Sequence, residues 1–247
     1  GTKRVDMRAS VENEWLCAVL LRAFGLPVAA CDIRRFGDAK ALVVERFDRA
    51  LHSSGRYWLR IPQEDFCQAT GTPPSRKYEA EGGPGLVAMA RLLAGSEAGE
   101  VDLETLFTAQ LLFWMLAATD GHAKNFSLRL LPRSRYRLTP LYDVLSAWPI
   151  AGSKAGQIHP TKLKLALALR GKSAHYAVAT IRRRHFLETA KLMGLRDANG
   201  IIDAVVARAP AALAAAEREV PRGFPSHVLE PILAGVERSV QRLAAEG

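Results

Sequence analysis

The sequence is poor in cysteine and has no long apolar run. Its 247 residues contain three cysteines, Cys17, Cys31 and Cys67, an odd number without CxxC spacing. This pattern argues against a disulfide or zinc framework and favours a reducing compartment, the cytoplasm. No apolar run approaches the roughly 20 residues of a membrane span, and the first ten residues lack the apolar segment of a secretory signal. We therefore expect a cytoplasmic protein with no membrane association.

Positive charge is in excess. The chain has 34 Lys and Arg against 25 Asp and Glu, a formal net charge of +9 and a pI near 9.8. A basic balance favours polyanionic partners such as nucleic acid, nucleotide phosphates or acidic proteins, although many soluble proteins are basic without such a partner. Hydrophobic residues make up 49% of the chain, so a core is available. The length suits one large domain or two small lobes that share a cleft.

The first 50 residues combine one helix with a predicted hairpin. Ser10 stands where it can cap a helix through VENEWLCAVLLRAF, and Gly25 ends that helix. Residues 31–36 and 40–47 have the composition of two strands, and the Gly-Asp pair between them predicts a hairpin turn. These residues are therefore expected to form a small lobe that contains strands.

Residues 51–247 are predicted to be mostly helical. The segment over residues 103–119 is apolar nearly all round, which is typical of a helix at the centre of a helical lobe. The other expected segments are a helix from about Pro62, a helix over residues 85–95, two short strands within residues 128–140, and three or four C-terminal helices punctuated by Gly171, Pro210, Pro221 and Pro225. Together with residues 1–50, this pattern predicts two lobes with room for a nucleotide between them.

The segment ATDGHAKNFS crowds polar side chains directly after that apolar helix. Asp120 and Asn125 have the D-x-x-x-x-N spacing of the protein-kinase catalytic loop, in which the Asp accepts the proton of the substrate hydroxyl and the Asn holds a magnesium ion. Asp143, after the predicted strand pair, offers a second carboxylate, and Mg²⁺ prefers oxygen ligands. The spacing is weak evidence when it stands alone, and it gains weight from the helix before it and from the strand pair and Asp after it.

Each of these residues also has an interpretation without function. Asp120 with Gly121 can be a solvated turn at a helix end, and Asp143 can be a helix N-cap or a turn residue. A lone His122 is more often a hydrogen-bonded structural histidine than a ligand. The same polar set also permits a metal phosphohydrolase that uses Asp120, His122, Asp143 and His159, although that hypothesis requires metal ligation by the histidines.

Seven segments together resemble the HipA family, the serine/threonine-protein kinase toxins of bacterial toxin–antitoxin modules. They read VENEWLC, VERFDR, RIPQEDFCQATG, KYEAEGGPG, ATDGHAKNFS, RLTPLYDVLSAWP and RHFLETAK. The resemblance implies an α+β fold, which is a divergent two-lobed protein-kinase fold with a mostly helical C-terminal lobe. It also implies transfer of phosphate from ATP with Mg²⁺ to a protein, glutamyl-tRNA synthetase in the family, with growth arrest and persistence as the result. The implied partners are a HipB-like helix-turn-helix antitoxin and, through the antitoxin complex, operator DNA.

Residue by residue, the resemblance implies a catalytic base and a nucleotide site. Asp120 matches the base, and Asn125 and Asp143 match the Mg²⁺ ligands. The residues that would contact ATP come from the hinge-like VERF segment, from the loop after the base and from the metal carboxylate with its neighbour; they are Glu45, Arg46, Phe47, His122, Ala123, Lys124, Asn125, Tyr142 and Asp143. The hinge contacts are expected mainly from backbone groups, and simple core packing is the alternative for Phe47.

The sequence also departs from the family pattern. Full-length relatives carry an upstream lobe with a phosphate-binding loop, a regulatory serine and a strand lysine that grips the ATP phosphates, and residues 1–10 show none of these. Lys3 is present, but no strand pattern surrounds it. We therefore expect the N-terminal part to be incomplete. The alternative to an active kinase is a pseudokinase or corepressor that binds operator DNA with the antitoxin, although retention of Asp120, Asn125 and Asp143 favours the kinase.

The positive charge clusters late in the sequence, in LPRSRYRL, TKLKLALALRGK and IRRRHFLETAK. Each basic residue can belong to a solvated surface without a partner. The family resemblance singles out Lys191, because relatives touch operator DNA near RHFLETAK. These segments show no aromatic interleaving for base stacking, so we expect contacts to phosphates, which position a protein on DNA without selecting the sequence.

Overall fold

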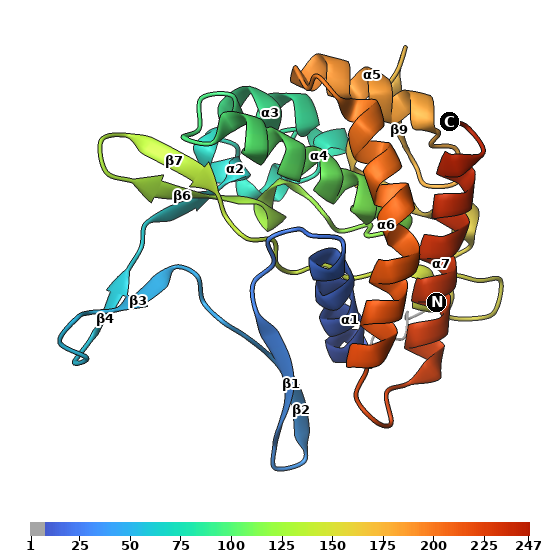
Figure 1. Cartoon of the computed structure of the whole chain (residues 1–247), viewed down its shortest axis with the longest axis horizontal. Coiled ribbons are helices and arrows are strands. Elements are labelled where there is room, and N and C mark those ends of the chain that lie inside the picture. The colour runs from blue at the N-terminus through green and yellow to red at the C-terminus, as the bar shows by residue number, and fades with distance from the viewer. Residues whose placement is uncertain (1–7) are drawn as a thin grey trace.

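Helix α4 lies at the centre of the helical body in the computed structural model (Figure 1), which describes residues 8–247. It runs from Gly99 to Met115 and is buried on nearly every side from Leu106 onward. A helix that is apolar all round has no face for solvent, so it takes the middle of the core. The predicted central helix is confirmed, but it ends before residue 119 because Ala117 adopts a positive φ of 48° and turns the chain away. Lys3 lies outside the described residues.

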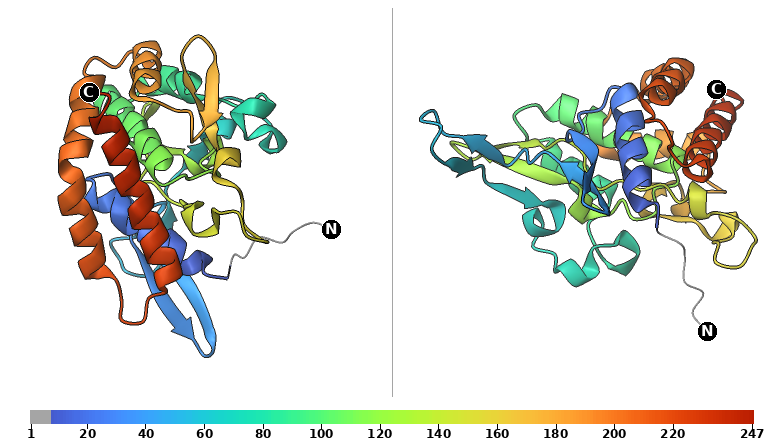
Figure 2. Two further views of the ribbon diagram at one scale, coloured as in Figure 1. Left: turned by 90° about the vertical axis from the view of Figure 1, so that its right-hand side faces the viewer. Right: turned by 90° about the horizontal axis from the view of Figure 1, so that it is seen from below.

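Six other α-helices of the described chain surround α4. They are α1 (Ser10–Ala23), α2 (Phe66–Ala69), α3 (Leu86–Leu93), α5 (Arg183–Met193), α6 (Ala198–Glu219) and α7 (Ser226–Ala244). α6 and α7 run side by side in opposite directions and pack on α1 (Figure 2). The prediction that Ser10 caps α1 is wrong: Ser10 already has helical geometry, and Ala9 occupies the cap position without a side-chain hydrogen bond.

Helix α6 continues through Pro210, which was expected to punctuate the C-terminal helices. Ile202, Val205 and Ala209 are buried, and this packing holds the helix together across the proline. By length and composition alone, α6 is the one helix in residues 8–247 that could cross a membrane. In the structure 28% of its apolar window is buried, and α6 packs against α1, α4 and α7.

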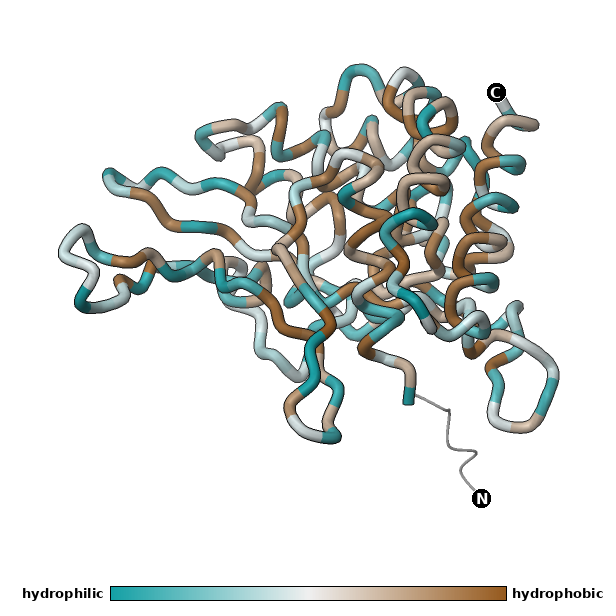
Figure 3. Tube along the Cα trace, turned by 60° about the horizontal axis from the view of Figure 1, so that its bottom comes forward, coloured by the Kyte–Doolittle hydropathy of each residue, from teal (hydrophilic) through white to brown (hydrophobic). Residues whose placement is uncertain are grey.

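Nine β-strands of the described residues form four small antiparallel sheets, ordered β1-β2, β3-β4, β5-β6-β7 and β8-β9. They are β1 (Cys31–Phe36), β2 (Ala39–Val44), β3 (Arg49–Leu51), β4 (Trp58–Arg60), β5 (Gln63–Asp65), β6 (Ser127–Leu131), β7 (Arg135–Leu138), β8 (Lys164–Arg170) and β9 (Ala174–Ala177). The β1–β2 and β3–β4 hairpins project away from the helical body, and polar residues gather at their tips (Figure 3). Short 3-10 helices connect the elements: η1 (Pro74–Arg76), η2 (Glu79–Glu81), η3 (Ala123–Asn125), η4 (Trp148–Ile150) and η5 (Pro160–Lys162).

Two segments differ from the prediction. The helix expected from about Pro62 is instead strand β5 followed by the single turn of α2. The segment KLALALR, expected to be helical, forms β8. Leu and Ala favour helices, but the leucines here recur at every second residue, which is the period of a strand. The predicted strand pairs over residues 31–47 and 128–140 are confirmed.

The β5–β6–β7 sheet and α4 bring distant segments to one place. The loop over residues 116–126 leaves α4 and enters β6, and residues 139–143 leave β7. The segment that leaves β7 is joined to the segment after α1 by a parallel bridge between Val28 and Leu141. The amide of Leu141 also donates to the carbonyl of Pro27 at 2.8 Å. The segment after α1 therefore lies beside Tyr142 and Asp143.

Candidate active site

The loop that carries Asp120 lies directly on the end of α4. A Cβ atom at Gly121 would lie 2.5 Å from the ring of Phe113, so only glycine allows this close approach. The amide of His122 donates to the carbonyl of Asp120, and the amide of Asn125 donates to the carbonyl of His122, both at 2.9 Å. This tight loop leaves the side chain of Asp120 61% exposed while it buries His122 and Asn125.

Asn125 and Asp143 are brought together as the sequence predicted. The Asn125 amide nitrogen donates to Oδ2 of Asp143 at 3.0 Å and to its carbonyl oxygen at 2.9 Å. Asp143 has a positive φ of 57°, a backbone conformation that is rare outside glycine and that tends to occur at functional sites. The arrangement holds an exposed carboxylate next to a buried amide, and both groups carry oxygen atoms of the kind that Mg²⁺ prefers.

Asp120 is contacted by Tyr78, which comes from another part of the chain. The Tyr78 hydroxyl donates a hydrogen bond to Oδ1 of Asp120, and that oxygen lies 3.7 Å from Nε2 of His122. The rings of Tyr78 and His122 meet edge to face, with centroids 5.2 Å apart. Burial lowers the pKa of His122, with Asp120 acting in the opposite direction, and its Nδ1 has no hydrogen-bond partner within the described residues.

Lys124 and Tyr142 tie the loop to its surroundings. The ammonium of Lys124 lies 2.6 Å from one carboxylate oxygen of Asp65, whose other oxygen caps α2. The Tyr142 hydroxyl donates to the carbonyl of Lys124 at 3.0 Å and lies 2.6 Å from Oγ of Ser127. Since a phenol has one proton, Ser127 is the donor in that second bond. Ala123 is fully buried between these contacts.

The predicted hinge residues follow β2. The amide of Glu45 donates to the carbonyl of Ala30 at 2.8 Å, and the carbonyl of Phe47 accepts from Arg129 at 2.7 Å. Both of these backbone groups are thus engaged within the protein. The ring of Phe47 lies 5.7 Å from that of Tyr142, so the hinge contacts the residue beside the predicted metal carboxylate.

Arg46 stabilises the turn that follows the hinge. Its guanidinium forms a two-pronged ion pair with buried Asp48, with nitrogen–oxygen distances of 2.8 and 2.7 Å. Arg49 contacts the same carboxylate. The hydrogen bonds from Arg46 lower the pKa of Asp48 to about 2, so this carboxylate stays charged at neutral pH. The side chain of Arg46 therefore has a structural partner in place of a ligand.

A small apolar pocket opens beside Tyr142 and Asp143. Its walls are formed by α1 (Ala18 and Leu21), by the segment after α1 (Val28) and by the β1–β2 hairpin (Leu42 and Val44). Glu14 also lines it, and burial, with a smaller effect of Asp143, raises the pKa of Glu14 to about 7. The enclosed space measures about 20 Å³. That is room for about one water molecule, so an adenine would have to part the hairpin from α1.

Sequence reasoning did not place Glu14 or Tyr78 in this site. Glu14 appeared only as one letter of the family motif VENEWLC, and Tyr78 only as one letter of KYEAEGGPG. Both side chains reach the site from elements that are remote in sequence, and local patterns carry no information on such distances. No local signal sets Glu14 apart from Glu12, two positions earlier in the same helix.

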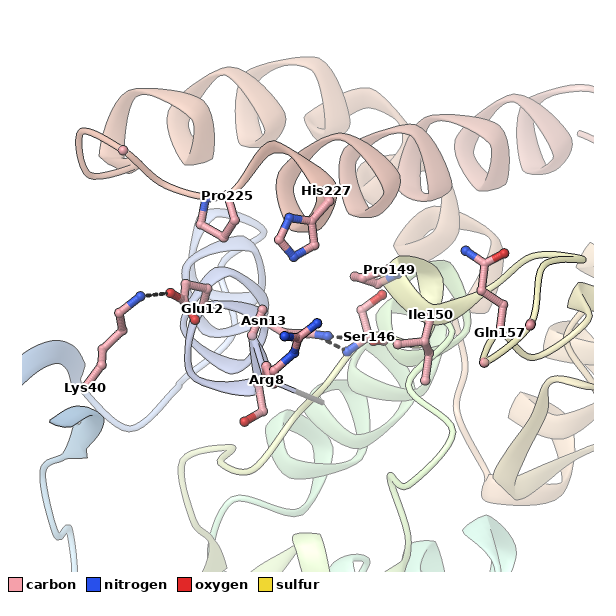
Figure 4. A pocket seen from close by; sticks show the side chains of 15 residues that line it. Arg8, Glu12, Asn13, Lys40, Ser146, Pro149, Ile150, Gln157, Pro225 and His227 are labelled. Carbon is pink, nitrogen blue, oxygen red and sulfur yellow. Dashed lines mark hydrogen bonds and ion pairs between the residues drawn. The ribbon is translucent and has the colours of Figure 1, made fainter. Parts of the chain in front are cut away.

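A larger pocket of about 770 Å³ lies between the start of α1, the loop over residues 146–157 and the start of α7 (Figure 4). None of the predicted site residues lines it. Its buried polar side chains satisfy one another: Glu12 pairs with Lys40, and Asn13 exchanges two hydrogen bonds of 2.8 Å with the backbone of Ser146. The size of this pocket is therefore not evidence for a ligand.

The late basic segments do not form one surface. Arg183 is buried and pairs with Asp203 at 2.7 Å, so it cannot face DNA, because buried guanidinium groups require such partners. Arg135, the first residue of β7, pairs with Glu97 at 2.6 Å, and in Figure 1 the β6–β7 hairpin projects to the left while α5 lies at the top. Lys191, in the last turn of α5, is exposed, as a residue that touches DNA must be.

The chemistry of Asn125 and Asp143 suits Mg²⁺ better than a transition metal. A Mg²⁺ site commonly needs only one or two carboxylates, because phosphate oxygens and water complete it. A transition-metal phosphohydrolase needs a protein cluster, and residues 8–247 contain no group of three or more His, Cys, Asp or Glu placed to hold a metal ion. His159 instead accepts from the amide of Thr161 at the start of η5.

The elements of the site follow one another in the order found in protein kinases: a buried helix, a loop with an Asp and an Asn, an antiparallel strand pair and a second Asp. The fold is kinase-like. The backbone matches the proinflammatory kinase CtkA of Helicobacter pylori with a TM-score of 0.60 over 96% of this chain and 81% of that chain. The identity is 9%, so this is a likeness of fold alone. A model of the HipA-like C-terminal domain family matches residues 2–213, and the chain belongs to this family.

Two relatives from Shewanella oneidensis MR-1 make the likeness more specific. HipA, in the complex of the toxin–antitoxin system HipA, HipB and its operator DNA, matches with a TM-score of 0.77 and 25% identity over 92% of this chain and 55% of that chain. The serine/threonine-protein kinase toxin HipA is 37% identical over 147 residues, which are 55% of this chain and 34% of that protein. The matches cover between 32% and 45% of the length of the curated relatives.

Proposed function

We propose that this chain is the catalytic part of a HipA-like kinase that transfers the γ-phosphate of ATP to a serine or threonine hydroxyl of a protein. The observation that carries the proposal is the hydrogen bond from Asn125 to Asp143 beside the loop that holds Asp120. It joins two of the three polar residues that follow one another along the chain in the order that kinases use. Family membership and the kinase activity named for its relatives support the same conclusion.

Asp120 is the proposed catalytic base. Its exposed carboxylate can be reached by a hydroxyl of another protein and accepts the proton that the hydroxyl loses. The side-chain oxygen of Asn125 and the carboxylate of Asp143 hold Mg²⁺. Bound Mg-ATP supplies the phosphoryl group and the cation that offsets its charge. Positioning and charge stabilisation supply most of the rate enhancement.

The proposed adenine site is the apolar pocket between α1 and the β1–β2 hairpin. The hinge residues Glu45, Arg46 and Phe47 directly follow Val44, which lines this pocket. The Glu45 amide and the Phe47 carbonyl are already engaged, so the proposed contacts to adenine come from other backbone groups of the hinge. On the phosphate side, the site is completed by His122, Ala123, Lys124 and Tyr142. This division assigns residues 1–50 to the N-terminal lobe with the hinge and residues 51–247 to the C-terminal lobe. Because the pocket is small, the hairpin must move outward when a nucleotide binds.

The proposed partners are those of a toxin–antitoxin module in the cytoplasm. S. oneidensis HipA occurs in a complex with HipB and operator DNA, and the fold likeness to that complex supports a HipB-like antitoxin here. Lys191 is the proposed contact to operator phosphates. The proposed substrate is an aminoacyl-tRNA synthetase, glutamyl-tRNA synthetase by family resemblance, whose modification arrests growth.

The test is phosphate transfer by the intact protein. Protein, Mg²⁺ and labelled ATP are incubated with glutamyl-tRNA synthetase, and modified residues are identified by mass spectrometry. A phosphoserine or phosphothreonine that requires Asp120, and that the exposed control Glu188→Gln still produces, supports the kinase. Binding of Mg-ATP without transfer to any protein of a cell extract, together with a change in operator binding by the antitoxin, identifies a pseudokinase corepressor instead.

A further inference from the structure

The contact between Tyr78 and Asp120 links two segments that are 42 residues apart. Asp120 sits on the loop after α4, and Tyr78 precedes the short helix η2. The side chain of Asp120 is mostly exposed, and its hydrogen bond to Tyr78 joins it to an element outside its own loop. Its orientation therefore depends on where Tyr78 is held.

The backbone around Tyr78 is firmly fixed. The carbonyl of Tyr78 accepts from the amide of Glu81 at 3.0 Å and from the amide of Gly83 at 2.9 Å. A Cβ atom at Gly83 would lie 2.4 Å from the carbonyl oxygen of Arg76, so the turn closes only around glycine. The neighbouring Glu79 accepts from the amide of Ala168 in β8 at 2.7 Å. The segment is thus closed by its own turn and anchored to β8 through Glu79, the residue next to the tyrosine.

The electrostatic surroundings keep the Tyr78 hydroxyl a donor. Its hydrogen bond to Asp120, followed by burial, raises the pKa of Tyr78 to about 12. The titratable groups that face the Asp120 carboxylate are Tyr78 and His122, while Lys77 and Asp143 act on His122 through their charge. Because burial lowers the pKa of His122, its ring is neutral near pH 7 and is a weaker partner for the carboxylate than the phenol is.

We propose that Tyr78 is the positioning residue of the catalytic base, which holds Oδ1 of Asp120 so that Oδ2 faces the incoming substrate hydroxyl. This inference rests on the proposed kinase function and adds a residue to it. A carboxylate that turns freely presents the correct oxygen only part of the time, and a charge-assisted hydrogen bond from an anchored phenol removes that freedom.

The kinetic test compares Tyr78→Phe with Tyr136→Phe in the intact protein. Tyr136 is a matched control, because its hydroxyl donates to the carbonyl of Leu92 at 2.7 Å, away from the site. We expect Tyr78→Phe to lower kcat about tenfold or more while KM for ATP is unchanged, since a hydrogen bond to a charged group is lost. Tyr136→Phe should change neither quantity. In the Asp120→Asn background, Tyr78→Phe should have little further effect.

A second measurement needs neither ATP nor activity. The ring-carbon signal of Tyr78, assigned by its loss in Tyr78→Phe, is titrated by NMR. We expect Asp120→Ala to lower the pKa of Tyr78 towards the ordinary value of about 10, and Glu188→Ala to leave it unchanged. The inference is overturned if Asp120→Ala does not change the pKa of Tyr78, or if Tyr78→Phe keeps wild-type kcat while Asp120→Asn is inactive. If the kinase proposal itself is wrong, the result differs, because neither the wild type nor Asp120→Asn then transfers phosphate.

Discussion

The side-chain nitrogen of Asn125 lies 3.0 Å from Oδ2 of Asp143, although 18 residues separate the two in sequence. The intervening β6–β7 hairpin folds back on itself and returns the chain to its starting point. Because the amide nitrogen faces Asp143, the amide oxygen is directed away from it. The Asn125 amide must therefore turn before its oxygen and the Asp143 carboxylate can bind one cation together, so the hydrogen bond holds the two residues close without presenting both oxygens.

Replacement of the proposed base should separate binding from transfer. Asp120→Asn keeps the size and polarity of the side chain but cannot accept a proton. We expect Mg-ATP binding to be retained and phosphate transfer to fall by a factor on the order of 10² to 10⁴. Calorimetry and a transfer assay measure the two quantities. In cells, the variant should relieve growth arrest at an unchanged level of folded protein. Phosphorylation near the wild-type rate would refute the assignment.

Loss of either proposed metal ligand should weaken nucleotide binding only when Mg²⁺ is present. Asp143→Ala removes a charged oxygen ligand, and Asn125→Ala removes both an oxygen and the hydrogen bond that fixes Asp143. ATP titrations with Mg²⁺ and with EDTA should therefore differ strongly for wild type and little for the variants. If Asp143→Ala binds Mg-ATP as tightly as wild type does, the metal lies elsewhere. Glu188→Ala, which removes an exposed carboxylate on α5, is the control.

Glu14 should make stability depend on pH. Burial raises its pKa from 4.5 to about 7 in the folded protein. The folded state therefore binds more protons than the unfolded state between these values, and the free energy of unfolding falls as pH rises through them. Glu14→Gln removes this loss of stability at high pH. It should stabilise the protein by roughly 1 to 2 kcal/mol at pH 8, after a discount for the solvated part of the side chain, and by almost nothing at pH 4.

The measurement for Glu14 is urea unfolding at both pH values in buffer without nucleotide and without metal ions. The exposed Glu188 on α5 provides the control, and Glu188→Gln should shift stability little at either pH. An equal effect of Glu14→Gln at pH 4 and at pH 8 would show that packing, and not the charge of Glu14, is responsible.

Lys191 should contribute to the salt dependence of operator binding. Each phosphate contact releases about one counterion, so Lys191→Ala should make the log–log salt slope shallower by roughly one unit in the complex with antitoxin and operator DNA. Kinase activity should not change. Lys154→Ala, an exposed lysine outside α5, should leave the slope as it was. If addition of the protein to antitoxin and DNA alters neither affinity nor slope, the exposed face of α5 does not meet DNA.

Local pattern was enough to predict the elements that carry the site. The apolar run of α4, the strand pairs and the spacing of Asp120, Asn125 and Asp143 were readable, because hydrophobic period and turn chemistry are properties of neighbouring residues. The order of these elements also indicated the kinase-like arrangement before any distance was known. The α5–α7 helices were expected, and only their boundaries and the continuity through Pro210 were missed.

Packing between distant segments decided the rest. β8 became a strand because its alternating leucines found β9 and a core to face, against the helix propensity of Leu and Ala. The partners of Asp120, Lys124 and Arg183 are Tyr78, Asp65 and Asp203, each far away along the chain. The raised pKa of Glu14 arises from burial beside Asp143, 129 positions later in the numbering. Such contacts form only once the whole core has assembled, so no local pattern in the sequence predicts them.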